Sequence, residues 1–108
     1  MRRPVLLTAD AEADLADLHQ FVRENDSPQR ADDLLDQMQV TLERLGDLPD
    51  RGSVPRELKA LGISQFRQVF LNPYRVIYGR TPGQVVVFLV ADGRRDFQSL
   101  LMRRLVRP

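Results

Sequence analysis

The side chains best suited to chemistry in this sequence are arginines, which gather in the second half of the chain. Lys59 is the only lysine, so nearly every positive charge is a guanidinium. A guanidinium makes paired hydrogen bonds to carboxylate or phosphate and stays charged, so it binds anions well and serves poorly as a base. The arginines expected to make such contacts are Arg67, Arg75, Arg94, Arg95, Arg103 and Arg104.

Few groups in this half could move a proton beside those arginines. Tyr74 and Tyr78 alternate to the strand face opposite Arg75, where they are poorly placed to work with it. Asp92 and Asp96 lie on either side of Arg94 and Arg95 in the sequence. We expect these two aspartates to orient the arginine pair through salt bridges rather than to act as bases. The full set of proton-moving candidates is Glu57, Lys59, Tyr74, Tyr78, Asp92 and Asp96.

Other kinds of chemical site find little support. His19 is the only histidine, and we interpret it as a partly exposed helix residue. With no cysteine and no other ligand at a suitable spacing, the sequence predicts no metal site, no thiolate nucleophile and no disulfide. Neither a glycine-rich phosphate loop nor a Ser/His/Asp arrangement can be assembled, and no cofactor is expected.

The net charge of +1 conceals a strong asymmetry along the chain. Residues 9–50 hold 12 Asp or Glu against 3 Arg, a net charge of −9. Residues 51–108 hold 11 Arg or Lys against 3 Asp or Glu, a net charge of +8. The second half therefore predicts a basic surface, of the kind that meets nucleic acid or an acidic protein segment.

The elements that must position these residues begin with a short strand over 3–7. Thr8 then suits the N-cap of a helix that ends near Asn25, and Ser27 with Pro28 suits the start of a second helix. Apolar residues recur at spacings of three and four in both segments, and Gly46 is a credible C-cap. Two antiparallel helices joined by a short turn follow from this pattern.

The second half of the chain indicates a sheet. Prolines and glycines predict a loop over 48–62 with one irregular turn, and strands are expected over 63–71, 74–80 and 84–91. Apolar spacing predicts a short final helix over 96–106. The order indicates an α+β fold: N-terminal strand, antiparallel two-helix hairpin, three-stranded antiparallel meander and short C-terminal helix, with the helices packed on one face of one sheet.

The length and hydropathy of the chain limit how many domains and which kinds of segment it can contain. We expect residues 1–108 to form a single domain, because a chain of this size supports one modest core. No apolar run is long enough to span a membrane, and the first residues lack the pattern of a signal peptide. These features predict a cytoplasmic protein without membrane partners.

The order of elements, with the residues on them, resembles one known superfamily over nearly the whole chain. The matching stretches are "AEADLADLHQFV", "LERLGDLPDRGSVPREL", "FRQVFLNPYRVIY", "VVVFLVADGRRD" and "LLMRRL". They are similar to toxins of the RelE/ParE superfamily, the toxic half of bacterial type II toxin–antitoxin modules. The resemblance implies a sheet with a helical hairpin, and a cognate antitoxin whose C-terminal part wraps the toxin.

The superfamily divides by mechanism: RelE-like members cut mRNA on the ribosome, while ParE-like members poison DNA gyrase. In the RelE-like pattern, Arg75 and Arg95 here would correspond to the phosphate-binding arginines. Where that pattern carries a pair of lysines this chain has Phe66 and Gln68, and where it carries a tyrosine this chain has Leu101. These departures remove most of the catalytic set, so no catalytic residue is assigned outside the nuclease alternative.

Three interpretations follow. The leading one is a ParE-like toxin, a plasmid-stabilisation type of protein that is not an enzyme and poisons DNA gyrase by contact. The second is an endoribonuclease acting on ribosome and mRNA with a different catalytic set. The third is a non-toxic homologue that retains antitoxin binding. In each case a ParD-like antitoxin should present an acidic, amphipathic C-terminal segment to the arginines, with affinity that falls as salt rises.

Overall fold

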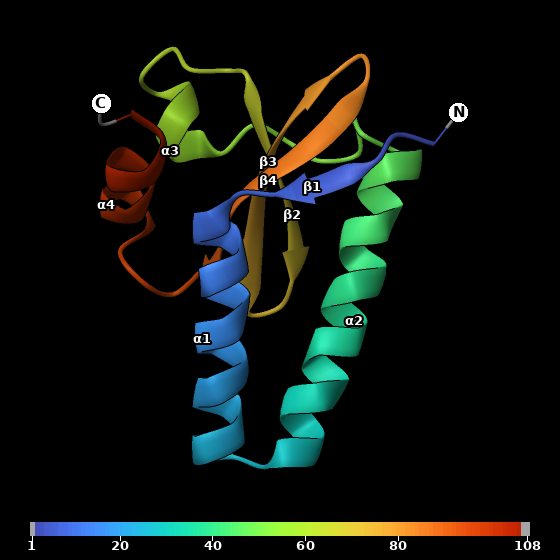
Figure 1. Cartoon of the computed structure of the whole chain (residues 1–108). Helices are drawn as coiled ribbons and strands as arrows, with labels where there is room; N and C mark the ends of the chain where they lie inside the picture. Colours follow the sequence, from blue (N-terminus) through green and yellow to red (C-terminus); the bar gives the residue numbers. More distant parts are fainter. Residues whose placement is uncertain (1, 107–108) are drawn as a thin grey trace.

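A computed structural model describes residues 2–106 of the chain, and Figure 1 shows a helical hairpin standing beside a twisted sheet. The elements in chain order are β1 (Val5–Leu7), α1 (Ala9–Asn25), α2 (Pro28–Asp47), α3 (Arg56–Lys59), β2 (Phe66–Leu71), β3 (Tyr74–Thr81), β4 (Gln84–Asp92), α4 (Phe97–Leu101) and η1 (Met102–Val106). The α+β fold expected from the sequence is confirmed, with its N-terminal strand, two long helices, meander and short C-terminal helix.

The hairpin helices begin where their capping residues predict. The Thr8 side chain accepts a hydrogen bond from the backbone N–H of Ala11, and the Ser27 side chain accepts one from Arg30. Pro28 occupies the first turn of α2, where its missing N–H costs nothing. Both predicted helix starts are therefore confirmed.

The sheet has the order β1-β4-β3-β2. Strands β2, β3 and β4 form the predicted antiparallel meander, and β1 joins it by parallel pairing with β4. The register of β3 against β4 shifts between Ile77 and Tyr78, so one residue of β4, Phe88, is left out of the pairing. Because β1 covers only residues 85–87 of β4, the rest of that edge needs another partner.

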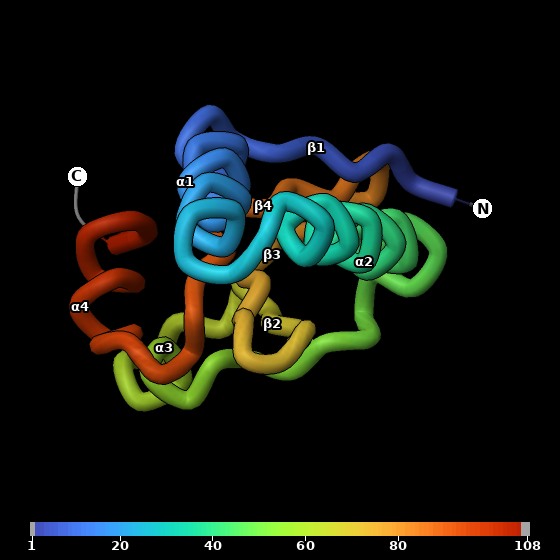
Figure 2. The backbone as a smooth tube through the Cα atoms, turned by 90° about the horizontal axis from the view of Figure 1, so that it is seen from below, coloured from blue at the N-terminus to red at the C-terminus, as the bar shows by residue number. Residues whose placement is uncertain are grey.

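Apolar side chains form two clusters on opposite faces of the sheet. On one face, β-strand residues such as Val76, Tyr78 and Val87 pack against α1 and α2. On the other, Ile77 and Leu89 pack against α3 and α4. Figure 2 shows the sheet between the hairpin and these short helices. The expectation that all helices pack on one face of the sheet therefore holds for the hairpin only. Strand β3 carries apolar side chains on both of its faces, so the second face also needs a cover.

Three element boundaries differ from the predicted ones. Gly46 lies inside α2 rather than at its C-cap, which is Leu48. A glycine is needed there because a Cβ would lie 2.4 Å from the carbonyl oxygen of Arg3. The second strand begins at Phe66, because Ile63 donates its backbone N–H to Leu58 and so closes the turn after α3. The predicted C-terminal helix is present, but it widens into the π-helical turn η1. No helix in the described part of the chain is long and apolar enough to cross a membrane.

Candidate functional site

Arg75 is the most thoroughly engaged of the predicted site residues. Its Nη1 and Nη2 atoms donate to the two carboxylate oxygens of Glu57 at 2.8 and 3.0 Å. Its Nε and Nη2 atoms also donate to the side-chain oxygen of Gln68 at 2.9 and 2.5 Å. Only 9% of the residue is exposed, so Arg75 is a buried guanidinium with internal acceptors on two sides.

Backbone and ring contacts fix this guanidinium in place. The ring of Phe97, the first residue of α4, lies 3.9 Å from the central carbon of the guanidinium, a cation–π contact. Gly93 packs on the aliphatic part of Arg75, where a Cβ would lie 2.8 Å from Cδ. Glu57 comes from α3, Gln68 from β2 and Phe97 from α4, so Arg75 ties three elements to β3.

Acid–base chemistry at this position has no support. The Arg75 guanidinium holds the pKa of the Glu57 carboxyl below its usual value, which keeps that group charged and a weak base. Gln68 is used to hold Arg75, and Leu101 is buried in the core. Burial raises the pKa of Tyr78, whose hydroxyl donates to Pro49 from the opposite face of the sheet.

Arg104 closes the open edge of β4. Its Nη1 and Nη2 atoms donate to the two carboxylate oxygens of Asp14, both at 2.9 Å, and Nη1 also donates to the Phe88 carbonyl at 2.9 Å. Asp14 in turn accepts the backbone N–H of Val90 at 3.0 Å. Beyond the end of β1, the Asp14–Arg104 pair thus satisfies backbone groups of β4 that a neighbouring strand would otherwise pair with. The same pair links the C-terminal segment to α1.

Arg67 is also used inside the fold. Its Nη1 atom donates to the Gly52 carbonyl at 2.5 Å, which holds the loop after α2 against β2. The Tyr78 hydroxyl accepts the backbone N–H of Gly52 at 3.0 Å and so supports the same loop. Unlike Arg75 and Arg104, this arginine is only partly satisfied, because its buried Nε atom has no hydrogen-bond partner among the described residues.

Three predicted site residues, Arg94, Arg95 and Arg103, are exposed, and we call them the exposed arginines. Arg94 donates to the carboxylate of Asp92, with the shortest contact at 2.6 Å, as expected from the sequence. Within residues 2–106, the side chains of Arg95 and Arg103 form neither an ion pair nor a hydrogen bond.

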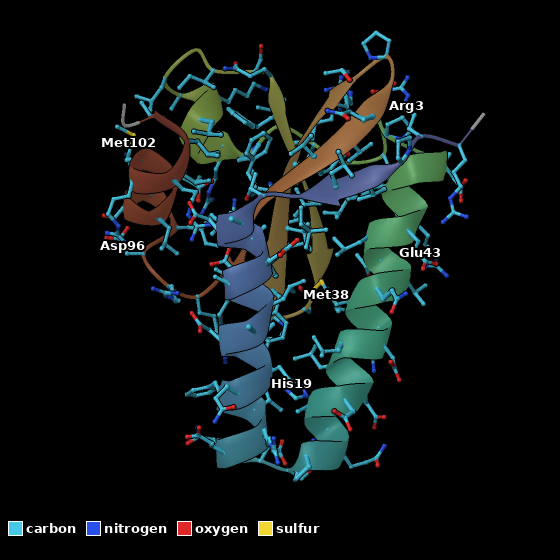
Figure 3. The ribbon with its side chains drawn as sticks, in the orientation of Figure 1. Arg3, His19, Met38, Glu43, Asp96 and Met102 are labelled. Atoms are coloured by element: carbon cyan, nitrogen blue, oxygen red, sulfur yellow. The ribbon has the colours of Figure 1, made fainter. Side chains whose placement is uncertain are left out.

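Asp96 departs from the expectation that it would orient the arginine pair. Its carboxylate instead accepts the backbone N–H and the hydroxyl of Ser99, at 3.2 and 2.7 Å, and so caps α4. Figure 3 shows Asp96 at the outer side of the C-terminal segment. The sequence pattern favoured a salt bridge because Asp96 follows two arginines, but a side chain at a helix start satisfies local N–H groups first.

A groove of about 450 Å³ runs between α1 and the end of β4, beside Arg94 and Arg95. Phe21 stands at its edge with 65% of its surface exposed. The lining residues are Asp14, Asp17, Leu18, Phe21, Tyr74, Val90, Ala91, Asp92, Arg94 and Arg95. The groove therefore offers an apolar floor with carboxylates along the helix and guanidinium groups at the turn, which suits an amphipathic peptide segment.

His19 is a partly exposed helix residue, as the sequence predicts. His19 lies on α1, and its Nε2 atom is 2.9 Å from a carboxylate oxygen of Asp32 on α2, across the hairpin (Figure 3). Among residues 2–106 no group of three or more His, Cys, Asp or Glu side chains could hold a metal ion. The His19–Asp32 contact joins α1 to α2.

Three contributors to these arginine sites were not predicted from the sequence. Glu57 was considered only as a proton-moving group, and neither Asp14 nor Gly93 was singled out. One signal was available for Asp14: its position on the apolar side of α1, next to Leu15 and Leu18, puts a charge close to the core. Nothing in the sequence alone pairs Glu57 with Arg75.

Comparison with known proteins adds to this geometry. Residues 5–97 match the model of a family described as "ParE toxin of type II toxin-antitoxin system, parDE". No curated protein sequence matches the chain. Among solved structures, the chain is similar to one from the chromosomal ParDE TA system of P. aeruginosa, with a TM-score of 0.70 and 13% identity, covering 84% of this chain and 96% of that one. At that identity the similarity establishes the fold.

Proposed function

This chain belongs to the ParE toxin family of type II toxin–antitoxin systems, and we propose that it inhibits growth by poisoning DNA gyrase until a cognate antitoxin neutralises it. The gyrase target follows from the resemblance to ParE-like toxins. Contact, rather than bond-breaking by this chain, would then be the mechanism. The exposed arginines and the groove beside them supply the surface for such contact.

The internal engagement of Arg75 carries this proposal. An RNA-cleaving enzyme needs a free cation at the phosphate and a group that takes the proton of the 2′-hydroxyl. Here Arg75 already binds Glu57 and Gln68. Burial raises the pKa of Tyr74, the tyrosine nearer to the exposed arginines, so it stays protonated at neutral pH and is a poor base. A protein that acts only by binding its target needs neither a free catalytic cation nor a general base.

The antitoxin contact would use the exposed arginines. A carboxylate of the antitoxin can pair with Arg95, which has no internal partner among the described residues, or compete with Asp92 for Arg94. An apolar side chain beside that carboxylate can reach Leu18 and Phe21 in the groove. The sequence of such a segment would alternate acidic and apolar residues, in keeping with the ParD-like partner expected above.

The first test is a gyrase assay with the purified protein. Relaxed plasmid, gyrase and ATP are mixed with increasing amounts of toxin, and both supercoiling and linear, cleaved plasmid are followed. We expect loss of supercoiling or trapped cleavage, reversed by the ParD-type antitoxin. No effect of folded protein at large molar excess would contradict the proposal, and ribosome-dependent cleavage of mRNA in a translation extract would then be tested in its place.

Matched variants locate the contact surface in the same assay. The double variant Arg94→Ala with Arg95→Ala removes two charges beside the groove, while Arg23→Ala with Arg44→Ala removes two exposed charges from α1 and α2. Gyrase inhibition or antitoxin affinity should fall at least about tenfold for the first pair and stay within about twofold for the second. Equal effects would show that net charge alone matters.

A further inference from the structure

The carboxylate of Glu57 occupies a position that suits an external oxyanion. Arg75 presents two parallel N–H groups to it, at 2.8 and 3.0 Å, and this fork binds phosphate as readily as carboxylate. Gln68 and Phe97 hold the guanidinium from its other sides, through the bonds to the Gln68 oxygen and the ring contact at 3.9 Å. The orientation of Arg75 therefore does not depend on Glu57 alone.

The space that Glu57 fills borders on solvent. The side chain of Glu57 is 15% exposed and that of Arg75 is 11% exposed. Leu58, the next residue of α3, is 1% exposed and anchors this short helix in the second core cluster. Truncation at Glu57 would thus open a small, water-accessible cavity above a charged guanidinium, while the anchor of α3 remains in place.

A buried guanidinium without a counter-charge is strongly unfavourable. Arg75 stays charged at every accessible pH, so loss of Glu57 cannot be relieved by deprotonation. A small anion from solution can relieve it, because a tetrahedral oxyanion offers two oxygens to the same pair of N–H groups.

We propose that Arg75, Gln68 and Phe97 form a masked oxyanion site, in which Glu57 is a permanent internal ligand that excludes phosphate. The native protein then binds no phosphodiester through Arg75. Removal of Glu57 alone opens the site to phosphate or sulfate. The inference concerns only this side-chain cluster, so it can fail while the gyrase proposal holds, and the reverse is also true.

Thermal unfolding in phosphate and in chloride, at equal ionic strength and pH 7, tests this inference. The variants are Glu57→Ala, which opens the site, and Glu57→Gln, which keeps it filled without charge. Asp92→Ala is the matched control, because it frees the exposed Arg94 instead of a buried arginine. The wild-type protein, Glu57→Gln and Asp92→Ala should each shift in Tm by less than about 1 °C between the two salts.

The Glu57→Ala variant should gain stability in phosphate. For a dissociation constant of about 10 mM, phosphate at about 100 mM would multiply its folded-to-unfolded ratio roughly 11-fold. For a domain of this size that is a rise in Tm of about 5 °C or more. A folded Glu57→Ala variant whose Tm responds to phosphate no more than that of Asp92→Ala would overturn the inference.

Two further measurements keep the test decisive. In ¹H–¹⁵N spectra of Glu57→Ala, added phosphate should shift the Nε–H signal of Arg75 and reach saturation; shifts confined to Arg94 and Arg95 would count against the site. If Glu57→Ala is unfolded in chloride, it and Glu57→Ser are refolded in phosphate at the same ionic strength. Recovery of the fold in phosphate alone supports the masked site, and failure of phosphate to restore either variant rejects it.

Discussion

Truncation of Asp14 should destabilise the protein far more than the loss of an ordinary surface carboxylate. Asp14→Ala removes three hydrogen bonds at once: two from Arg104 and one from the backbone N–H of Val90. The side chains of Asp14 and Arg104 are 16% and 23% exposed, so the pair is mostly buried. The variant leaves the Val90 N–H without its acceptor, and Arg104 keeps only the Phe88 carbonyl at 2.9 Å and the carboxylate of Asp10, 3.9 Å away.

The size of the effect can be estimated from these contacts. Breaking a fully buried pair costs about 3–5 kcal/mol, and the partial exposure of Arg104 lets water recover much of that. An unpaired backbone N–H costs about 1–3 kcal/mol, at the lower end if a water enters the space. We therefore expect a loss of about 2–3 kcal/mol, a large part of the roughly 5–15 kcal/mol that holds a small domain together.

The assay is urea unfolding followed by circular dichroism, with the midpoint compared at a common slope. Asp14→Asn keeps one acceptor oxygen and should lose about 1 kcal/mol. Asp47→Ala is the control, since Asp47 contacts Arg2 at 3.8 Å and both side chains are more than half exposed. A double-mutant cycle with Arg104→Ala should give a coupling near 1 kcal/mol. A loss for Asp14→Ala no larger than that for Asp47→Ala would refute the edge-closing role.

Three other outcomes follow from the same contacts. Gly93→Ala should destabilise the protein by about 1–3 kcal/mol in urea, because its Cβ would meet Arg75 at 2.8 Å, while Gly83→Ala, with nothing within 4 Å, should cost less than about 0.5 kcal/mol. Arg75 lowers the folded-state pKa of Glu57 below its ordinary value of 4.5, so this contribution to stability is present above about pH 4.5 and is lost as pH falls through the lower, folded-state pKa. Thermal melts between pH 3 and pH 7 should accordingly show a shallower acid decline for Glu57→Gln, and an unchanged slope would contradict the pairing. The dissociation constant of the antitoxin complex should rise with salt in a fluorescence titration, and Arg94→Ala with Arg95→Ala should flatten that dependence.

Elements were predictable from the sequence where local chemistry decides them. Thr8 and Ser27 cap their helices within three residues of chain, and the strands of the meander carry their own turn signals. The predicted C-cap at Gly46 was wrong, because this glycine serves the close approach of the Arg3 backbone, which is distant in sequence. A sequence pattern read over a few neighbouring residues cannot predict such a contact, because the contact depends on the tertiary fold.

The arginine contacts were the least predictable part of the candidate site. The sequence separation is 18 residues between Arg75 and Glu57 and 90 residues between Arg104 and Asp14. Many carboxylates were available to each arginine, because residues 9–50 hold 12 of them. Only the packing of α3 and η1 on the sheet decides which carboxylate comes within reach of each arginine. The basic character of the second half was thus evident, but its division into buried and exposed arginines was not.

That division separates two arginines that the RelE-like pattern would place in one phosphate site. Arg75 is buried and binds Glu57 and Gln68, whereas Arg95 is exposed and, within the described chain, forms no ion pair. Loss of Arg75 should therefore lower the free energy of unfolding, with any loss of toxicity following from the fold. Loss of Arg95 should weaken partner contact with the unfolding midpoint unchanged. A shared catalytic role would instead make both variants stable and inactive, so the two measurements together distinguish a contact poison from a nuclease.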